Sequence, residues 1–323
     1  FMKLLITSNI PEDIYNELNK NFDITYHNSN IPLTREEIIE KIKGKDALLC
    51  PLSDKIDKDV IDASDNLKII ANYGAGFDNI DINYAREKGI VVTNAPAPAS
   101  AISTAELTFG LMLASARRIV SGDKVTREGK FYGWRPTFYL GSELKDKTLG
   151  IIGLGNIGKN LAKRAKAFEM NVIYYSRTRK EDFEKEFVLK YMEKDDVIKN
   201  SDFLSLHTAF VPELRHMISK KELEMMKKSA ILINASRGPI VDEDALADAL
   251  IENKIAGAAL DVYEKEPKVN EKLLALDNVI LAPHLGNATF EARLEMGKNA
   301  KDNLIDFKNG KTPKNKVNWG VKW

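Results

Sequence analysis

Three segments late in the chain each end an apolar run with a side chain suited to acid–base or anion chemistry. They are Arg237 in INASRGPIVDEDAL, Glu266 in LDVYEKEP and His284 in LAPHLGNAT. An arginine binds a planar carboxylate through two hydrogen bonds, a histidine transfers protons near neutral pH, and a nearby carboxylate favours the protonated imidazole. Together these functions suit the reduction of a 2-oxo acid, and we take the three as candidate catalytic residues. Each alone also has an ordinary structural interpretation as a surface charge or a structural histidine.

A glycine-rich loop supplies a second chemical signal. Gly153, Gly155 and Gly158 form GxGxxG between a strand-like run and a helix-like run in TLGIIGLGNIGKNLAKRAKAF. The first glycine permits a tight turn, the second lets the backbone approach a pyrophosphate, and the third lets helix and strand pack closely. Asn156 and Ile157 open the helix, whose free N–H groups attract an anion. We therefore predict a dinucleotide site here.

The residues after the next strand bear on the type of dinucleotide. An NAD-selective fold places an acid on the ribose 2′-hydroxyl about 20 residues after the glycines. Ser176 stands 18 residues after Gly158, and it is followed by Arg177, Thr178 and Arg179. Guanidinium and hydroxyl groups suit a 2′-phosphate, so NADP(H) is favoured over NAD(H). The alternative is that both arginines are solvated charges at the end of a strand.

The elements that position these residues form two series. From Met2 to Pro96, five short apolar runs alternate with segments of helical period, and from Lys147 a second series of six begins. Such alternation predicts parallel sheets with helices on both faces. The predicted fold is α/β, with two doubly wound parallel-sheet domains joined by two long helices, at residues 102–119 and 289–308. The expected boundaries are residues 1–98 with 288–323 for one domain, and 99–287 for the other.

Composition excludes several function classes. The 323 residues carry 48 Lys+Arg against 47 Asp+Glu, a net charge of +1, which gives no indication of a nucleic-acid or membrane surface. Cys50 is the single cysteine, so no intrachain disulfide and no cysteine-only metal cluster can form, and no metal site is predicted. The start FMKLLITS has too short an apolar run for a signal peptide. A cytoplasmic location is expected.

Five ordered blocks resemble the D-isomer-specific 2-hydroxyacid dehydrogenase family over essentially the whole chain. They are GLGNIG at 153–158, SDFLSLH at 201–207, LINASRGPIVDEDAL at 232–246, GAALDVYEKEP at 257–267 and APHLGNAT at 282–289. The resemblance implies a flavodoxin-like substrate-binding domain and a Rossmann coenzyme domain. It also implies that Arg237 orients the substrate, that Glu266 pairs with the acid/base, and that His284 is that acid/base.

The resemblance assigns further contacts. Asp261 would hold the nicotinamide carboxamide, and Thr104, His207 and Ala235 would join the cofactor site. In YGAGFDNID at residues 73–81, backbone N–H groups around Ala75 and Gly76 would bind the substrate carboxylate.

Two stretches, LLCPLSDKID at 48–57 and GWRPTFYLGSEL at 133–144, look most like the glyoxylate/hydroxypyruvate reductases of this family, which commonly use NADPH. Leu52, Ser53 and Trp134 would then contact a small polar substrate. In relatives, the segment before the glycine loop belongs to a dimer arm, so a homodimer is expected. Trp134 is either a contact to the second subunit or a buried anchor.

Other interpretations stay open at this point. Within the family they are a 2-ketogluconate-type, a D-lactate-type or a phosphoglycerate-type dehydrogenase. A phosphoglycerate enzyme often carries an extra regulatory domain, for which 323 residues leave no room, and a lactate type is expected to have an acid near Ser176. From another class, the alternative is a dinucleotide-sensing corepressor or interaction protein.

Overall fold

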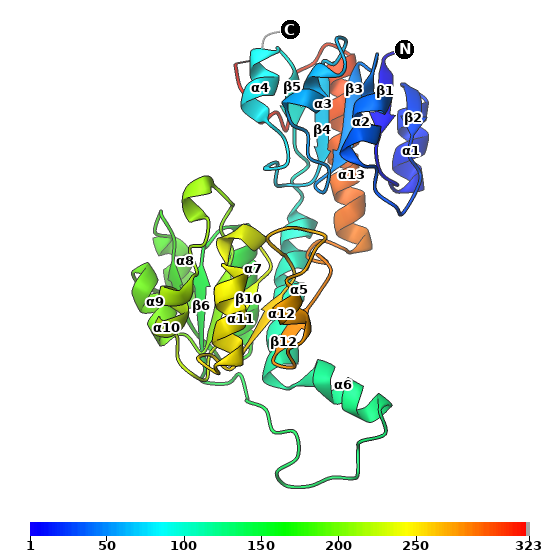
Figure 1. Cartoon of the computed structure of the whole chain (residues 1–323). Coiled ribbons are helices and arrows are strands. Elements are labelled where there is room, and N and C mark those ends of the chain that lie inside the picture. The colour runs from blue at the N-terminus through cyan, green and yellow to red at the C-terminus, as the bar shows by residue number, and fades with distance from the viewer. Residues whose placement is uncertain (321–323) are drawn as a thin grey trace. The chain divides into compact units, whose positions relative to one another are not determined.

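The computed structural model describes residues 1–320 and divides into two compact units, Phe1–Ser100 with the residues from Thr289 onward, and Ala101–Ala288 (Figure 1). The elements of the first unit are β1 (Lys3–Ile6), α1 (Glu12–Asn19), β2 (Asp23–Tyr26), α2 (Arg35–Ile42), β3 (Ala47–Pro51), α3 (Lys58–Asp62), β4 (Ile69–Tyr73), α4 (Ile82–Glu87), β5 (Val91–Thr93) and α13 (Phe290–Lys308). Its five strands are all parallel, in the order β2-β1-β3-β4-β5.

Alternating strand residues build two apolar layers in this unit. Leu4 and Leu49 face α1 and α13, whereas Leu5 and Leu48 face α2, α3 and α4. This alternation follows from the period of two in a strand, and burial on both faces explains why the strands are continuous apolar runs. Thr34 caps α2 with a capping box to Glu37, and Thr289 caps α13.

The second unit holds a larger parallel sheet. Its elements are α5 (Pro98–Ala116, which begins in the first unit), α6 (Ile119–Arg127), β6 (Thr148–Ile152), α7 (Asn156–Ala167), β7 (Asn171–Tyr175), α8 (Glu181–Phe187), β8 (Lys190–Tyr191), α9 (Lys194–Asn200), β9 (Phe203–Leu206), η1 (Pro212–Leu214), α10 (Lys220–Met225), β10 (Ile231–Asn234), η2 (Gly238–Ile240), α11 (Glu243–Ile251), β11 (Gly257–Leu260), α12 (Glu271–Leu274) and β12 (Val279–Leu281). The strand order is β12-β11-β10-β9-β6-β7-β8. Helices α5 and α7 cover one face, and α9, α10 and α11 cover the other.

The α/β prediction with two parallel sheets is confirmed, with two differences in detail. The second sheet has a seventh strand, β8, whose two residues are too short to show a period. The helix predicted at residues 102–119 begins earlier, at Pro98, and ends at Ala116. Arg118 has a left-handed backbone with φ of 55°, so the chain turns there and Ile119 starts the separate helix α6.

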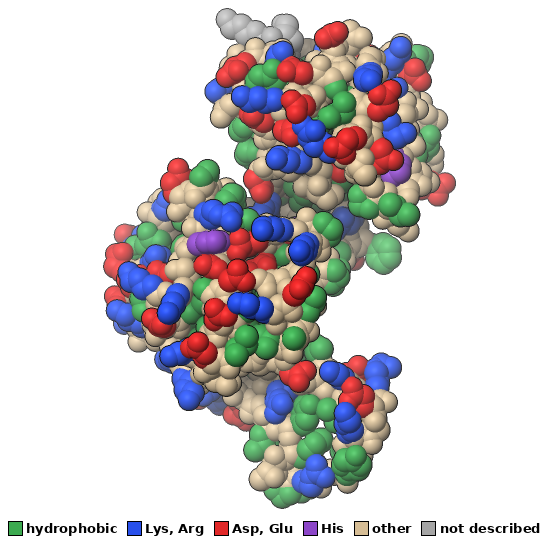
Figure 2. Space-filling model, viewed as in Figure 1, with side chains coloured by type: hydrophobic (Ala, Val, Ile, Leu, Met, Phe, Trp, Pro, Cys, Tyr) green, Lys and Arg blue, Asp and Glu red, His purple; other side chains and the backbone are tan. Residues whose placement is uncertain are grey.

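The chain passes between the units within α5, after Ser100, and again after Ala288. By length and composition alone, α5 is long and apolar enough to cross a membrane, and half of its most apolar window is buried inside the protein. Acidic and basic side chains are interspersed over the face in Figure 2. The cytoplasmic location stays a prediction.

Candidate active site

Arg237 stands three residues beyond the carboxyl end of β10, on a turn that Asn234 holds. The Asn234 side chain donates to the Arg237 carbonyl at 3.0 Å, and its oxygen accepts from the Ser236 N–H and hydroxyl at 3.1 and 2.9 Å. The Nη1 of Arg237 donates to the Ser236 carbonyl at 2.9 Å. Asn234 therefore fixes the direction in which the backbone presents the guanidinium. The sequence interpretation missed this residue, although an asparagine at the end of a strand is a typical turn signal.

Gly238 sets the distance between the Arg237 turn and the segment that carries Glu266. A Cβ at position 238 would lie 1.9 Å from the carbonyl carbon and oxygen of Tyr263. Only a residue without a side chain allows this approach. The glycine thus has a positioning role that sequence reasoning passed over, although its place in the ASRGP motif was visible.

Glu266 and His284 form a hydrogen-bonded pair. His284 Nδ1 lies 2.8 Å from Glu266 Oε2, and Glu266 Oε1 accepts the Tyr263 N–H at 3.1 Å. These hydrogen bonds hold the two side chains in place. Both side chains are 36% exposed, so a ligand can still reach them. Burial opposes ionisation of Glu266, but the hydrogen bond and charge of His284, with the charge of Arg237, lower its pKa overall. The carboxylate orients the ring through Nδ1, so Nε2 is the ring nitrogen that can exchange a proton with a ligand.

The backbone of His284 is itself constrained. Its φ of 54° lies in the left-handed region, which costs a non-glycine residue on the order of 1 kcal/mol. Asp261, at the end of β11 and fully buried, accepts the N–H groups of Leu285 and Gly286 at 2.6 and 2.8 Å. Burial raises the pKa of Asp261. Its carboxylate therefore fixes the loop that carries His284, a task the sequence did not predict, and its contact with a carboxamide stays a prediction.

A network of charged side chains lies behind these two segments. His216 Nε2 contacts Glu264 Oε2 at 3.0 Å, Arg215 contacts the same oxygen at 3.1 Å, and His216 Nδ1 lies 3.7 Å from Asp242. Glu243 and Glu264 each accept the other's backbone N–H. Asp242, Glu264 and His216 have ligand atoms close enough for a metal ion, yet these atoms already pair with one another and with Arg215. The network ties the loop after Arg237 to the turn before Glu266.

The glycine loop fits a dinucleotide in the way its sequence predicts. Gly153 has φ of 100°, and a Cβ there would lie 2.5 Å from the His207 carbonyl oxygen. At Gly158 a Cβ would lie 2.4 Å from the Gly153 oxygen, whereas at Gly155 nothing lies within 4 Å. Two glycines therefore permit close packing and the middle one faces open space. Gly155 and Asn156 are exposed at the N-terminus of α7, where free N–H groups suit a phosphate.

Other predicted cofactor residues lie at the same end of this sheet but are mostly buried. Thr104 and Ala235 are buried, and the Thr104 hydroxyl lies 3.2 Å from a Cβ built on Gly286. The His207 ring bonds to the Ser205 hydroxyl at 2.7 Å, and burial lowers its pKa to about 4. Within the part of the chain that the structure describes, its buried Nδ1 has no hydrogen-bond partner. His207 is therefore a neutral ring under the glycine loop.

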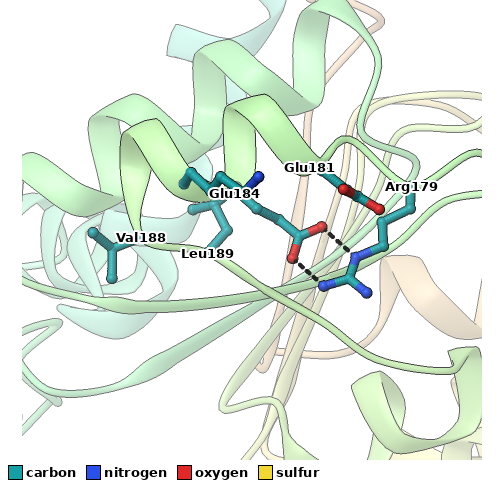
Figure 3. A pocket seen from close by; sticks show the side chains of 6 residues that line it. Arg179, Glu181, Glu184, Val188 and Leu189 are labelled. Atoms are coloured by element: carbon teal, nitrogen blue, oxygen red, sulfur yellow. Dashed lines mark hydrogen bonds and ion pairs between the residues drawn. The ribbon is translucent and has the colours of Figure 1, made fainter.

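The turn Ser176–Arg179 presents its two arginines in different ways. Arg177 and Thr178 are exposed, and the Ser176 hydroxyl donates to the Thr178 carbonyl at 3.0 Å. Arg179, however, is paired with Glu184, to which Nε and Nη2 donate at 2.7 and 2.9 Å (Figure 3). Arg179 is thus already engaged by a carboxylate on α8, a partner that the sequence did not reveal, and the role of both arginines at a 2′-phosphate stays a prediction.

The predicted substrate residues of the first unit adjoin one another within that unit. The Leu52 side chain packs over Gly74, where a Cβ would lie 2.6 Å from it. The carbonyls of Ala75 and Gly76 accept from Asn94 and Asn72 at 2.8 and 2.7 Å, so the loop is anchored. Ser53 and Ala75 are exposed. Their role in substrate binding stays a prediction.

Trp134 lies in the irregular segment between α6 and β6 and is 84% exposed. The buried-anchor interpretation is therefore wrong for this chain. The same arm exposes Ile119, Val120, Phe131, Tyr132 and Leu140.

Comparisons with known proteins show what the whole chain is similar to. The profile described as D-isomer specific 2-hydroxyacid dehydrogenase, NAD binding domain, matches residues 109–286. A Staphylococcus haemolyticus protein, named provisionally as a 2-hydroxyacid dehydrogenase, is 49% identical over 98% of this chain and 99% of its own length. A glyoxylate reductase from Paecilomyes thermophila shares 31% identity and a TM-score of 0.85, covering 98% of both chains. The NADPH-dependent glyoxylate/hydroxypyruvate reductase of Sinorhizobium meliloti, in complex with NADP and malonate, shares 28% identity and a TM-score of 0.86, covering 98% of this chain and 96% of that one.

Proposed function

Because this chain belongs to the D-isomer-specific 2-hydroxyacid dehydrogenase family, we propose that it reduces glyoxylate or hydroxypyruvate to the D-2-hydroxy acid, with NADPH favoured over NADH. The observation that carries the proposal is the 2.8 Å contact between His284 and Glu266, on a segment that Gly238 holds against the Arg237 turn. The bound nicotinamide supplies the hydride that reduces C2 of the 2-oxo acid.

The side chains of this chain supply position and charge. Arg237 binds the substrate carboxylate through two N–H donors and polarises the carbonyl. His284 gives its Nε2 proton to the carbonyl oxygen as that oxygen becomes a hydroxyl. Glu266 stabilises the protonated ring through Nδ1 and so keeps the proton on the nitrogen that faces the substrate. Ala75 and Gly76 are expected to add backbone N–H groups to the carboxylate.

The proposed substrate rests on the similarity of this chain to two known reductases and on one small polar side chain, Ser53. Two structures similar to this chain are a glyoxylate reductase and a glyoxylate/hydroxypyruvate reductase. Ser53 offers an exposed hydroxyl beside Leu52, which suits a short polar acid better than a bulky one. The 2-ketogluconate-type and D-lactate-type activities are the alternatives.

The preference for NADPH rests on Ser176 and Arg177. Ser176 stands where an acid would contact a ribose 2′-hydroxyl, and no carboxylate side chain of the turn Ser176–Lys180 opposes a 2′-phosphate. Arg177 adds an exposed cation beside it. The similar enzyme from S. meliloti is NADPH-dependent by name.

The test is the loss of reduced-cofactor absorbance with the purified protein. NADPH and NADH are compared against glyoxylate, hydroxypyruvate, pyruvate and 2-ketogluconate. We expect the highest kcat/KM for NADPH with the two- or three-carbon acids. A preference for 2-ketogluconate or pyruvate would contradict the substrate, and a preference for NADH would contradict the cofactor.

We also propose that the protein acts as a homodimer through the arm formed by residues 119–144. Large apolar side chains on an exposed arm indicate a surface that a partner covers. Trp134 is the proposed contact to the second subunit. Sedimentation or light scattering should give twice the 36.2 kDa chain mass, and Trp134→Ala with Phe131→Ala should shift the protein toward the monomer.

A further inference from the structure

The turn between β7 and α8 is held at both ends by one tyrosine hydroxyl. Tyr174, fully buried in β7, accepts the backbone N–H of Lys180 at 2.9 Å, so the hydroxyl closes the loop from Tyr175 to Lys180. It donates to Glu184 Oε2 at 2.7 Å. Burial, with the neighbouring carboxylate, raises the pKa of Tyr174 to about 12, so the hydroxyl stays a donor.

The Glu184 carboxylate accepts three hydrogen bonds from two side chains. It accepts two hydrogen bonds from Arg179 (Figure 3) and one from Tyr174. It is only 8% exposed although it lies on the short helix α8. The hydrogen bonds of Arg179, against burial, lower its pKa to about 2, so it is ionised at any working pH. Glu184 is thus a fixed anion that binds the end of the turn to α8.

Arg179 is positioned from two sides. Its guanidinium lies 5.4 Å from the centre of the Tyr191 ring, and that ring packs edge-on against Tyr174. With Glu184 it forms a nearly neutral pair, so its attraction for an added anion is weak. Arg177, two residues earlier, is exposed and makes no ion pair with any described residue. Of the two arginines of the turn, Arg179 is therefore already paired with a carboxylate, whereas Arg177 is exposed to solvent.

We propose that Glu184 is a specificity-determining positioning residue, which fixes Arg179 and, with Tyr174, holds the turn so that Arg177 meets a 2′-phosphate. This inference rests on the proposed use of NADPH. Arg177 supplies the discriminating charge, and Arg179 acts as an anchor for the turn. The carboxylate thereby aids the binding of an anion, although its own charge has the same sign.

A matched control lies on the same helix. Glu181 also lines the open pocket beside Arg179, together with Glu184, Lys185, Val188 and Leu189, but no hydrogen bond joins Glu181 to Arg179 (Figure 3). Glu181→Gln and Glu184→Gln remove the same charge three residues apart. If charge near the phosphate were the only effect, both variants would bind the phosphate more tightly.

The experiment measures binding of 2′,5′-ADP and 5′-AMP to the full chain by calorimetry, with kcat/KM for NADPH and NADH as a second readout. Because a charge-assisted hydrogen bond is lost, we expect Glu184→Gln to weaken 2′,5′-ADP binding about tenfold and to change 5′-AMP binding less than about twofold. Glu181→Gln should leave 2′,5′-ADP binding unchanged or tighter. In an Arg177→Ala background, the effect of Glu184→Gln should disappear.

Tyr174→Phe gives a second variant in case Glu184→Gln does not fold, and we expect it to weaken 2′,5′-ADP binding selectively, about threefold. Equal loss for both ligands, tighter binding in Glu184→Gln, or an undiminished effect without Arg177 would overturn the inference. If the wild-type protein itself does not distinguish 2′,5′-ADP from 5′-AMP, the proposed NADPH preference fails and this inference fails with it. If the wild type distinguishes them and Glu184→Gln does so equally well, only the inference fails.

Discussion

The two parallel sheets both place polar residues at their carboxyl ends, yet they use them differently. In the first unit, Thr7 and Asp54 bond to one another, as do Asn72 and Asn79, and Asp54 and Asn72 are 4% and 0% exposed. In the second unit, Glu266 and His284 are paired but remain 36% exposed. Polar residues at this edge are therefore not sufficient to mark an active site.

The difference lies in what the hydrogen bonds leave available. The polar groups of the first unit hold loops together, as Asn79 does by donating to the carbonyls of Pro51 and Asp54. In the second unit, backbone and buried groups such as Asp261 hold the loops, and the proposed pair of Glu266 and His284 stays partly exposed. The comparison predicts that partly exposed polar groups such as His284 affect turnover most, whereas buried groups of either unit affect stability.

The largest expected effect comes from His284→Asn. Asparagine tolerates the left-handed backbone at this position, so the substitution removes the proton donor with little strain. We expect kcat to fall on the order of 10²- to 10⁴-fold. Dinucleotide affinity, measured by fluorescence titration, should stay unchanged. Wild-type turnover would remove His284 from the mechanism.

Arg237→Lys is expected to rank second. Lysine keeps the charge but lacks the two parallel N–H donors, so kcat/KM for the 2-oxo acid should fall about 30- to 100-fold. Steady-state kinetics should place the loss in the substrate and leave KM for the cofactor unchanged. A change confined to the cofactor would contradict the assignment.

The buried histidine of the second unit makes stability depend on acidity. His207 has a pKa of about 4 in the folded chain against 6.5 in the unfolded chain, so only the unfolded chain binds the proton between these values. Stability is retained above pH 6.5 and is lost as the pH falls toward 4, by on the order of 3 kcal/mol. Urea titrations across this range should show a shallower loss for His207→Gln. Identical pH profiles would show that the ring is not buried in solution.

The buried carboxyl of the first unit should act in the opposite direction. Burial raises the pKa of Asp54 from 3.8 to about 6, so the folded chain keeps a proton that the unfolded chain loses. This contribution favours folding below pH 4 and declines as the pH rises through 6. Asp54→Asn keeps an acceptor for Thr7 and should stabilise the protein at pH 7 by on the order of 2 kcal/mol. Destabilisation in a urea titration at pH 7 would contradict a raised pKa for the buried Asp54 carboxyl.

The smallest expected effect separates packing from binding in the glycine loop. Gly158→Ala places a Cβ against the Gly153 oxygen and should lower the free energy of unfolding by about 1–2 kcal/mol. Gly155→Ala meets no atom and should change stability by less than about 0.5 kcal/mol, while dinucleotide affinity falls. Thermal unfolding and cofactor titration together check the pair. Equal loss of stability in both variants would refute the division of roles.

The sequence predicted most of the architecture because strands buried on both faces are continuous apolar runs, and eleven of them were visible. It missed β8, which has two residues, and the break at Arg118, which depends on one backbone angle. It also predicted the glycine loop, where each glycine has a local steric reason.

The tertiary partners of the candidate site could not be predicted. Nothing local indicates that Asp261 accepts N–H groups from a loop 24 and 25 residues away, or that Glu184 folds back onto Arg179. Gly238 is another example, because the atoms it must avoid belong to Tyr263. Sequence reasoning identified the charged residues of the candidate site and missed the residues that position them.

The division of the chain into two units determines the order in which they can fold during synthesis. The first unit is discontinuous, and α13, which covers one face of its sheet, is synthesised only after residues 101–288. Translation of residues 101–288 takes on the order of 10–40 s, during which that face lacks its helix. The second unit is contiguous and can fold first. A nascent chain stalled before Thr289 should therefore carry a folded nucleotide unit and an open apolar sheet that chaperones recognise.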